Sequence, residues 1–179
     1  MRSGYPPASR SGRTWGTIMK PELGNDANFI LHHIGIAVPD LDDARESLQQ
    51  LFGFKVCSGP FDDVAHKVKV CFLRASPEDA VAIELVAPLS TNSPVAAIIE
   101  RSRMTSYHMC LETPDLMSAI SRAKKSGCVV VSEPSPAVAF RGRRIAWICM
   151  GSDQLIELLE SEASDMNTSQ TVTPSDPVD

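Results

Sequence analysis

The chain has 179 residues with a formal net charge of −5, and 43% of its residues are hydrophobic. A chain of this length can bury one sizeable core, and its acidic balance argues against nucleic acid or an anionic membrane as its main partner. No apolar run approaches the length of a membrane span, and the five cysteines include no C-x-x-C pair, which favours a reducing intracellular compartment.

The two ends differ in composition from the middle of the chain. Residues 1–28 contain four basic residues before their first acid, and residues 162–179 are rich in Ser, Thr, Asp and Pro. We expect a disordered extension and a disordered tail around one domain over 29–161. An Arg-rich, acid-poor start is also typical of transit peptides, so the expected location is the cytoplasm, or the mitochondrion if residues 1–20 form such a peptide.

The first half of this domain predicts a strand, a helix and three further strands. Apolar residues alternate over 33–38, so His33 should face away from the apolar side of its strand. Asp40 can cap a helix that runs to Gly53. The strands expected next are 54–57, which Gly59-Pro60 should end, 68–72 and 81–86.

The second half repeats this order of elements. Ser93-Pro94 opens a short connecting helix over 95–99. A long basic loop is expected over 133–143. The other expected elements are a strand over 106–112, a helix over 115–126 that Gly127 caps, and strands over 128–132, 144–149 and 154–159.

A sequence repeat relates the two halves. Setting His33 on His108, about seventy-five residues later, also sets Glu84 close to Glu157, each between two apolar residues. This period is too long for a solenoid repeat and suits a duplicated module that buries its open face against its twin. We therefore expect an α+β fold of two βαβββ modules, over 31–88 and 106–160.

Each module places one His on its first strand and one Glu on its last. If each module curls its sheet, these strands become neighbours at the centre and the four side chains converge. Two neutral imidazoles and two carboxylates balance the charge of one divalent ion and suit zinc, cobalt, nickel, manganese or ferrous iron better than calcium. The candidate ligands are His33, Glu84, His108 and Glu157.

Each of these residues also has a simpler interpretation. A lone His on a strand is usually half-buried and structural, and a lone Glu is usually solvated. The recurrence of a Glu between apolar neighbours in both modules favours ligands, because an inward carboxylate needs a partner.

Several motifs carry a resemblance to a known family. The segments are His33-Ile34-Gly35-Ile36-Ala37-Val38, Ile83-Glu84-Leu85 with Pro88-Leu89, Ser93-Pro94, Tyr107-His108 and Leu155-Ile156-Glu157-Leu158. Over roughly 31–160 the chain resembles the vicinal oxygen chelate (glyoxalase/bleomycin resistance/dioxygenase) superfamily, most of all its methylmalonyl-CoA epimerases. The resemblance implies a curled mixed sheet around one metal ion, which chelates two substrate oxygens while a proton moves at the adjacent carbon.

The chain departs from the epimerases at two places. Where they carry Glu-Gln-Gly or Glu-His-Gly, this chain has Ala65-His66-Lys67, so only His66 carries over, as a substrate contact or as an ordinary polar loop residue. Their Gly-rich loop is replaced by 137–141, which counts against a CoA substrate. Arg141, Arg143 and Arg144 could clamp a phosphate or carboxylate, or form a solvated basic turn.

His32 precedes the first candidate ligand on the same predicted strand. Because side chains alternate along a strand, His32 should face away from His33 and pack as an ordinary core residue.

The resemblance implies a metal-dependent isomerase or epimerase that abstracts a proton beside the carbonyl of a thioester or keto-acid. Glu157 is the favoured base by analogy with glyoxalases, and Glu84 is its near-symmetric counterpart. A glyoxalase I-type lyase and a drug-binding protein without catalysis are the alternatives. We expect a small-molecule substrate, no nucleic-acid or membrane partner, and a chain compatible with a homodimer.

Overall fold

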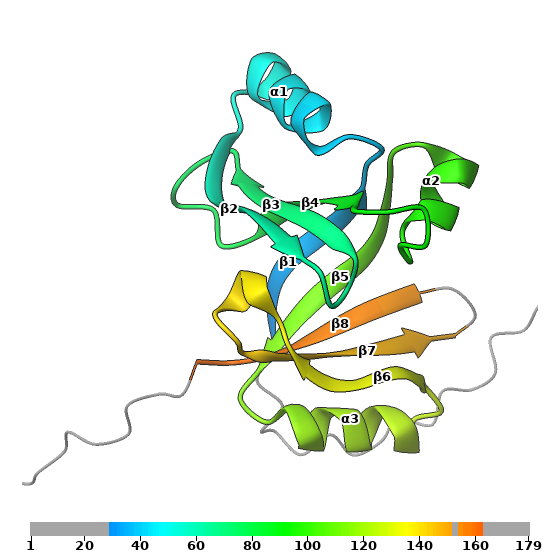
Figure 1. Cartoon of the computed structure of the whole chain (residues 1–179). Coiled ribbons are helices and arrows are strands. Elements are labelled where there is room, and N and C mark those ends of the chain that lie inside the picture. The colour runs from blue at the N-terminus through cyan, green and yellow to red at the C-terminus, as the bar shows by residue number, and fades with distance from the viewer. Residues whose placement is uncertain (1–28, 152–153, 163–179) are drawn as a thin grey trace, which may run out of the picture.

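The computed structural model describes residues 29–151 and 154–162 (Figure 1). The expected N-terminal extension and nearly all of the expected tail lie outside these residues, and the domain boundaries at 29 and 161 stay a prediction. Within the described part of the chain, no helix combines the length and the hydropathy needed to cross a bilayer.

The elements follow the predicted order twice. The first module contains β1 (Ile30–Ala37), α1 (Leu41–Phe52), β2 (Lys55–Asp63), β3 (Val68–Arg74) and β4 (Ala82–Pro88). After the connecting helix α2 (Ala96–Ser102), the second module contains β5 (Thr105–Thr113), α3 (Leu116–Lys125), β6 (Val129–Pro136), the 3-10 turn η1 (Val138–Phe140), β7 (Arg144–Met150) and β8 (Gln154–Glu160).

All these strands form one mixed sheet in the order β2-β3-β4-β1-β5-β8-β7-β6. The two modules meet where β1 pairs antiparallel with β5, while β4 runs parallel to β1 and β8 parallel to β5. Helix α1 covers the outside of one half of the curled sheet and α3 the outside of the other (Figure 1). The predicted α+β fold of two βαβββ modules is confirmed, and the strands that carry the candidate ligands lie side by side at its centre.

Local sequence signals explain the helix ends. The side chain of Asp40 accepts hydrogen bonds from the first-turn amides of α1, and Gly53 ends the helix with a φ of 72°. In the second module Asp115 caps α3 in the same way, and Gly127 follows the C-cap Ser126 with a φ of 84°. Both helices therefore begin and end where capping chemistry predicts.

Two strands are longer than the sequence indicates. Gly59-Pro60 is expected to end the second strand, but β2 continues through it to Asp63, with register shifts against β3. Similarly, β6 runs into the expected loop as far as Pro136. Both are edge strands of the sheet, where a proline needs no partner for the N–H that it lacks.

Two β-bulges correct the predicted orientation of His32. Between β1 and β5 the register shifts twice, leaving His32 as the extra residue on β1 and Tyr107 as the extra residue on β5. Each bulged residue directly precedes a candidate histidine ligand. The ring of His32 lies 5.4 Å from the ring of Phe140, which also stacks on His33, so His32 and His33 share one side of the strand and the prediction of opposite sides is wrong.

Candidate functional site

A glycine makes room at the centre of the sheet. In the ladder of β1, Gly35 is the partner of Glu84 on β4 and of His108 on β5. A Cβ atom at Gly35 would lie 1.8 Å from Cε1 of His108. Glycine at this position therefore allows the imidazole of His108 to cross β1 and reach the side chains from the other module.

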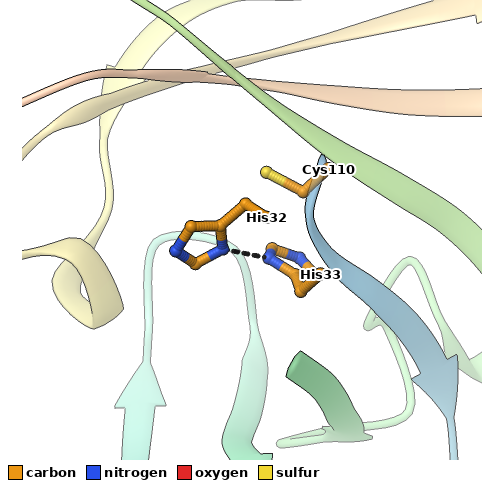
Figure 2. Close-up of side chains that lie close together, drawn as sticks. All are labelled: His32, His33 and Cys110. Atoms are coloured by element: carbon orange, nitrogen blue, oxygen red, sulfur yellow. Dashed lines mark hydrogen bonds between the residues drawn. The ribbon is translucent and has the colours of Figure 1, made fainter. Parts of the chain in front are cut away.

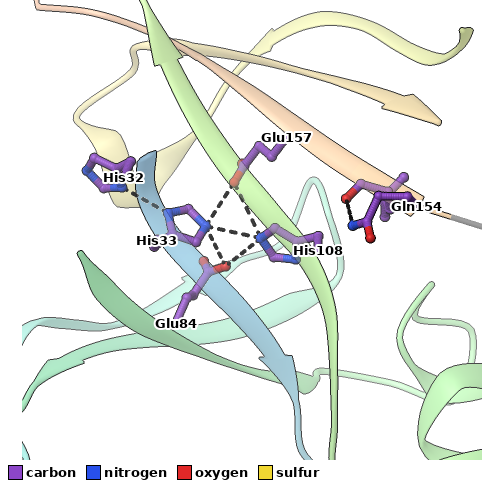
Figure 3. A network of polar contacts seen from close by, with 7 residues as sticks. His32, His33, Glu84, His108, Gln154 and Glu157 are labelled. Carbon is purple, nitrogen blue, oxygen red and sulfur yellow. Dashed lines mark hydrogen bonds and ion pairs between the residues drawn. The ribbon is translucent and has the colours of Figure 1, made fainter. Parts of the chain in front are cut away.

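The four predicted ligands converge at one buried point. Figure 3 shows their side chains directed toward one another from β1, β4, β5 and β8. Nε2 of His33 lies 3.0 Å from Nε2 of His108, 3.2 Å from Oε2 of Glu84 and 3.0 Å from Oε2 of Glu157. Nε2 of His108 lies 3.3 Å and 3.6 Å from the same two carboxylate oxygens. All four residues are buried.

These distances fit a metal centre. Ligand atoms placed tetrahedrally at about 2.0–2.1 Å from an ion are separated by about 3.3–3.4 Å, close to the values between these nitrogens and oxygens. Oε2 of Glu157 has no well-aligned hydrogen-bond donor in the described part of the chain, although the two imidazoles lie beside it. The four donor atoms thus surround a common point, as ligands of one ion do. Two carboxylates with two neutral imidazoles would also balance the charge of a divalent cation.

The charges in this cluster stabilise each other. Burial opposes a charge on His33, but Glu84 and Glu157 outweigh it and raise the pKa of His33 to about 10. They raise the pKa of His108 as well. Burial alone would raise the pKa of the two carboxyl groups, yet their contacts with the histidines lower both pKa values below the ordinary range. The glutamates are therefore held as carboxylates, the form that coordinates a metal or accepts a proton.

A second group of potential ligands shares His33. Nδ1 of His33 lies 2.9 Å from Nδ1 of His32, with the thiol of Cys110 nearby (Figure 2). This group offers fewer donors, and burial raises the pKa of the Cys110 thiol well above its usual value, which makes it a poor ligand. Burial and the charge of His33 lower the pKa of His32, so a neutral His32 can accept the Nδ1–H of His33 and orient its Nε2 toward the four-residue cluster.

Aromatic side chains enclose the cluster. The ring of Phe140 stacks on His33 at 5.9 Å, and the ring of Trp147 meets His108 edge-on at 4.9 Å. A cavity of about 40 Å³ lies against Glu84 and Glu157. Next to it is a more apolar groove of about 490 Å³, and the residues that line both spaces are His66, Val68, Tyr107 and Trp147. The small cavity at the carboxylates and the larger groove therefore share one wall.

His66, the residue carried over from the epimerase pattern, lies between these two spaces. Its Nδ1 is 2.9 Å from Oδ2 of Asp63, and its backbone N–H donates to Oδ1 of Asp63 at 3.0 Å. Its Nε2 is 3.3 Å from Oγ of Ser135, on the outermost strand of the other module. Sequence reasoning missed both partners. Only the three-residue spacing between Asp63 and His66 could have indicated the first, and Ser135 lies too far along the chain to be paired by inspection.

The three arginines are placed differently from one another. Arg143 lies 3.3 Å from a carboxylate oxygen of Glu112 and packs against Phe140, and Arg144 pairs with Glu160. Arg141 is exposed, and the described residues give it no carboxylate partner. None of the three lines the cavity or the groove beside the cluster. The expected anion clamp therefore stays a hypothesis.

Comparisons with known proteins agree with this architecture. The ethylmalonyl-CoA/methylmalonyl-CoA epimerase of Cereibacter sphaeroides is 31% identical over 119 residues, which is 66% of this chain and 86% of that protein. The human mitochondrial methylmalonyl-CoA epimerase is 30% identical over 105 residues, covering 58% of this chain and 57% of that protein.

Solved structures show the same relationship. The methylmalonyl-CoA epimerase of Mycobacterium tuberculosis matches with a TM-score of 0.65 and 28% identity, over 74% of this chain and 88% of that chain. A Streptomyces coelicolor methylmalonyl-CoA epimerase in complex with 2-nitronate-propionyl-CoA matches with a TM-score of 0.63 and 25% identity, over 74% of this chain and 97% of that chain.

The family model for the glyoxalase/bleomycin resistance protein/dioxygenase superfamily matches residues 32–147. This range begins at the first histidine pair and ends in β7. The resemblance drawn from the motifs is confirmed, and the chain belongs to the glyoxalase/bleomycin resistance/dioxygenase superfamily.

Proposed function

We propose that this protein is an epimerase that inverts the carbon beside the carbonyl of an acyl-CoA thioester, with one divalent metal ion held by His33, Glu84, His108 and Glu157. The observation that carries the proposal is the convergence of two imidazole nitrogens and two carboxylate oxygens, 3.0–3.6 Å apart, against a small cavity that Glu84 and Glu157 both line. The relatives named above support the reaction class.

The chemistry starts from the acidity of the hydrogen beside a carbonyl. A divalent ion bound by the four residues would polarise the substrate's carbonyl oxygen and so acidify that hydrogen. Glu157, held as a carboxylate and lining the cavity, is the base that we assign to its removal. Phe140 and Trp147 exclude bulk water from the cluster, which strengthens every charge interaction inside it.

The substrate class follows from the adjoining groove and from the relatives. The groove of about 490 Å³ is lined mainly by apolar side chains, including Val95, Ile98 and Val131, and suits the pantetheine portion of a CoA thioester. The Cereibacter relative is named for ethylmalonyl-CoA and methylmalonyl-CoA. These two observations outweigh the missing Gly-rich loop, which counts against CoA in the sequence.

Exchange of the α-proton in deuterated water tests the proposal. Purified protein loaded with cobalt or zinc should catalyse exchange and epimerisation of methylmalonyl-CoA or ethylmalonyl-CoA, and a chelator should abolish both. Turnover of the methylglyoxal–glutathione hemithioacetal, with no exchange on the thioesters, would support the lyase alternative instead. Tight ligand binding without any exchange would support a binding protein.

A further inference from the structure

Epimerisation needs two proton-transfer groups. A base that returns the proton to the face from which it came restores the starting stereoisomer, so inversion requires a second group on the other face. Glu84 is a weak candidate, because its Oε2 and that of Glu157 lie 3.2 Å and 3.0 Å from the same nitrogen of His33. The ligand oxygens of the two carboxylates lie within 4.8 Å of one another, which favours a second group from farther along the cavity wall.

His66 has the geometry of an acid–base group. It lies in the turn between β2 and β3 of the first module, whereas Glu157 projects from β8 of the second, and both line the small cavity. The carboxylate of Asp63 is buried and requires a donor, which fixes the proton of a neutral His66 on Nδ1. Nε2, which lies 3.3 Å from Oγ of Ser135, is then the nitrogen that can accept a proton. Its side chain is 26% exposed, so the ring can exchange protons with solvent between turnovers.

We infer that His66, positioned by Asp63, is the second acid–base catalyst of the epimerisation and acts on the substrate face opposite to Glu157. The inference rests on the proposed function. In one direction Glu157 takes the α-proton and a protonated His66 delivers the proton of Nε2 to the opposite face of the same carbon. Glu157 is then protonated and His66 neutral, and both are reset by exchange with solvent. In the other direction the roles are reversed, so the reaction needs no oxidant or further reactant.

Ser135 completes an Asp–His–Ser arrangement, which raises the question of acyl transfer. A serine nucleophile needs backbone donors for the oxyanion, and one of them commonly comes from the residue that follows the serine. Here that residue is Pro136, which has no N–H. Ser135 instead holds the His66 ring in place from β6 of the other module, at 3.3 Å from Nε2. The arrangement therefore suits proton transfer better than formation of an acyl-enzyme.

The test follows each pure epimer of methylmalonyl-CoA separately in deuterated water. The wild-type protein should exchange the α-proton of both epimers. The His66→Asn variant should keep exchange of the epimer whose proton faces Glu157, within about tenfold of wild type, and should lose exchange of the other epimer by about 10²–10⁴-fold. Interconversion should fall by the same factor, with an unchanged content of bound metal.

Asp63 is a positioning residue and gives a second readout. Asp63→Asn should lower kcat for both epimers by about 10–100-fold, because a functional histidine then loses the partner that orients it. KM and the metal content should change little. Asp62→Asn is the matched control, because Asp62 is the exposed neighbour and pairs with Lys69 at 3.5 Å on the surface. It should behave like wild type.

Three results would overturn the inference. They are interconversion by His66→Asn at the wild-type rate, equal loss of exchange for both epimers in that variant, and release of free CoA thiol that disappears in Ser135→Ala. If wild-type protein loaded with metal exchanges neither epimer, the proposed function itself fails. If the wild type interconverts the epimers and His66→Asn shows no difference between them, only the role of His66 is refuted.

Discussion

Nε2 of His33 lies 3.0 Å from Nε2 of His108, although 75 residues separate the two histidines. The close approach follows from the antiparallel pairing of β1 with β5, in which each module contributes its first strand to the centre of the sheet. The parallel neighbours β4 and β8 then add one glutamate from each side. A duplicated module thus forms one site from two incomplete halves.

Metal binding is the first prediction. The protein should bind about one divalent ion per chain. Loss of a residue that only hydrogen-bonds to a metal ligand weakens metal binding by about 10- to 100-fold, and His33→Ala and His108→Ala should each weaken it by more than this. His32→Phe should fall within that smaller range, since His32 contacts only Nδ1 of His33 within the cluster. Elemental analysis after metal loading, with circular dichroism to confirm folding, gives the answer. Equal metal content in wild type and the His33/His108 double variant would refute the ligand assignment.

Gly35→Ala should damage the site without removing a ligand. Its Cβ would lie 1.8 Å from Cε1 of His108, a ring already confined by Trp147 at 4.9 Å, so the imidazole has to move. We expect a large loss of metal affinity together with about 1–3 kcal/mol of destabilisation from overpacking. Titration with cobalt and thermal unfolding measure the two effects.

Gly53→Ala is the matched control for this substitution. Gly53 has a φ of 72° at the end of α1. Apart from its two chain neighbours, no described residue comes within 4 Å of the position that its Cβ would take, so alanine there strains the backbone without a clash. It should lower the melting temperature and leave metal affinity unchanged. Full metal affinity in Gly35→Ala would show that His108 can shift without consequence and that the close approach is unimportant.

The arginines near the start of β7 yield a prediction about the stability of the fold. Arg143→Ala removes a half-buried ion pair with Glu112 and a packing contact with Phe140, so the free energy of unfolding should fall by about 1–3 kcal/mol. Arg144→Ala should have little effect, because its pairing with Glu160 is exposed to solvent. Chemical denaturation of both variants measures the difference.

Arg141→Ala tests the anion clamp expected from the sequence. Since none of the three arginines lines the cavity or the groove, we expect KM for a CoA thioester to change by less than about threefold, below the effect of a lost charge-assisted hydrogen bond. A rise of more than about tenfold would show that Arg141 contacts the anionic end of the substrate after all.

The order of elements and the convergence of the four candidate ligands could be predicted because both depend on short-range or periodic signals. Alternation marked the strands, Asp40 and Gly53 marked a helix, and the recurrence of the His and Glu positions indicated which strands must meet. The length of β2 and β6 could not be predicted, because the tolerance of proline depends on a strand lying at the edge of the sheet.

The details around the ligands needed the structure. The orientation of His32 depends on a bulge, which exists only in the pairing of β1 with β5 and leaves no mark on the alternation of side chains. The contact between His66 and Ser135 joins residues 69 positions apart on the outer parts of the two modules. Such a contact arises from the curl of the whole sheet, and neither residue has a neighbour in sequence that indicates it.

Glu157→Gln should separate catalysis from metal binding. The amide keeps an oxygen donor and nearly the same shape but cannot accept a proton as a carboxylate does. Exchange of the epimer whose α-proton faces Glu157 should therefore fall by about 10²–10⁴-fold, while part of the metal affinity remains. Glu160→Gln, at the end of β8 and paired with Arg144, is the control and should keep full activity. Unchanged exchange of that epimer in Glu157→Gln would show that another residue is its base.

Metal binding should release protons. Glu84 and Glu157 raise the pKa of His33 to about 10, above its ordinary value of 6.5, so in the metal-free protein His33 carries a proton on Nε2 at pH 7 and loses it only as the pH rises through about 10. A nitrogen that coordinates a metal must first give up that proton, and the raised pKa of His108 adds to the effect. Affinity should therefore increase with pH across the neutral range, and titration calorimetry in buffers of different ionisation enthalpy should show release of at least about one proton per ion. An apparent binding enthalpy that is the same in every buffer would mean that no proton leaves, and would contradict the charge arrangement described for the cluster.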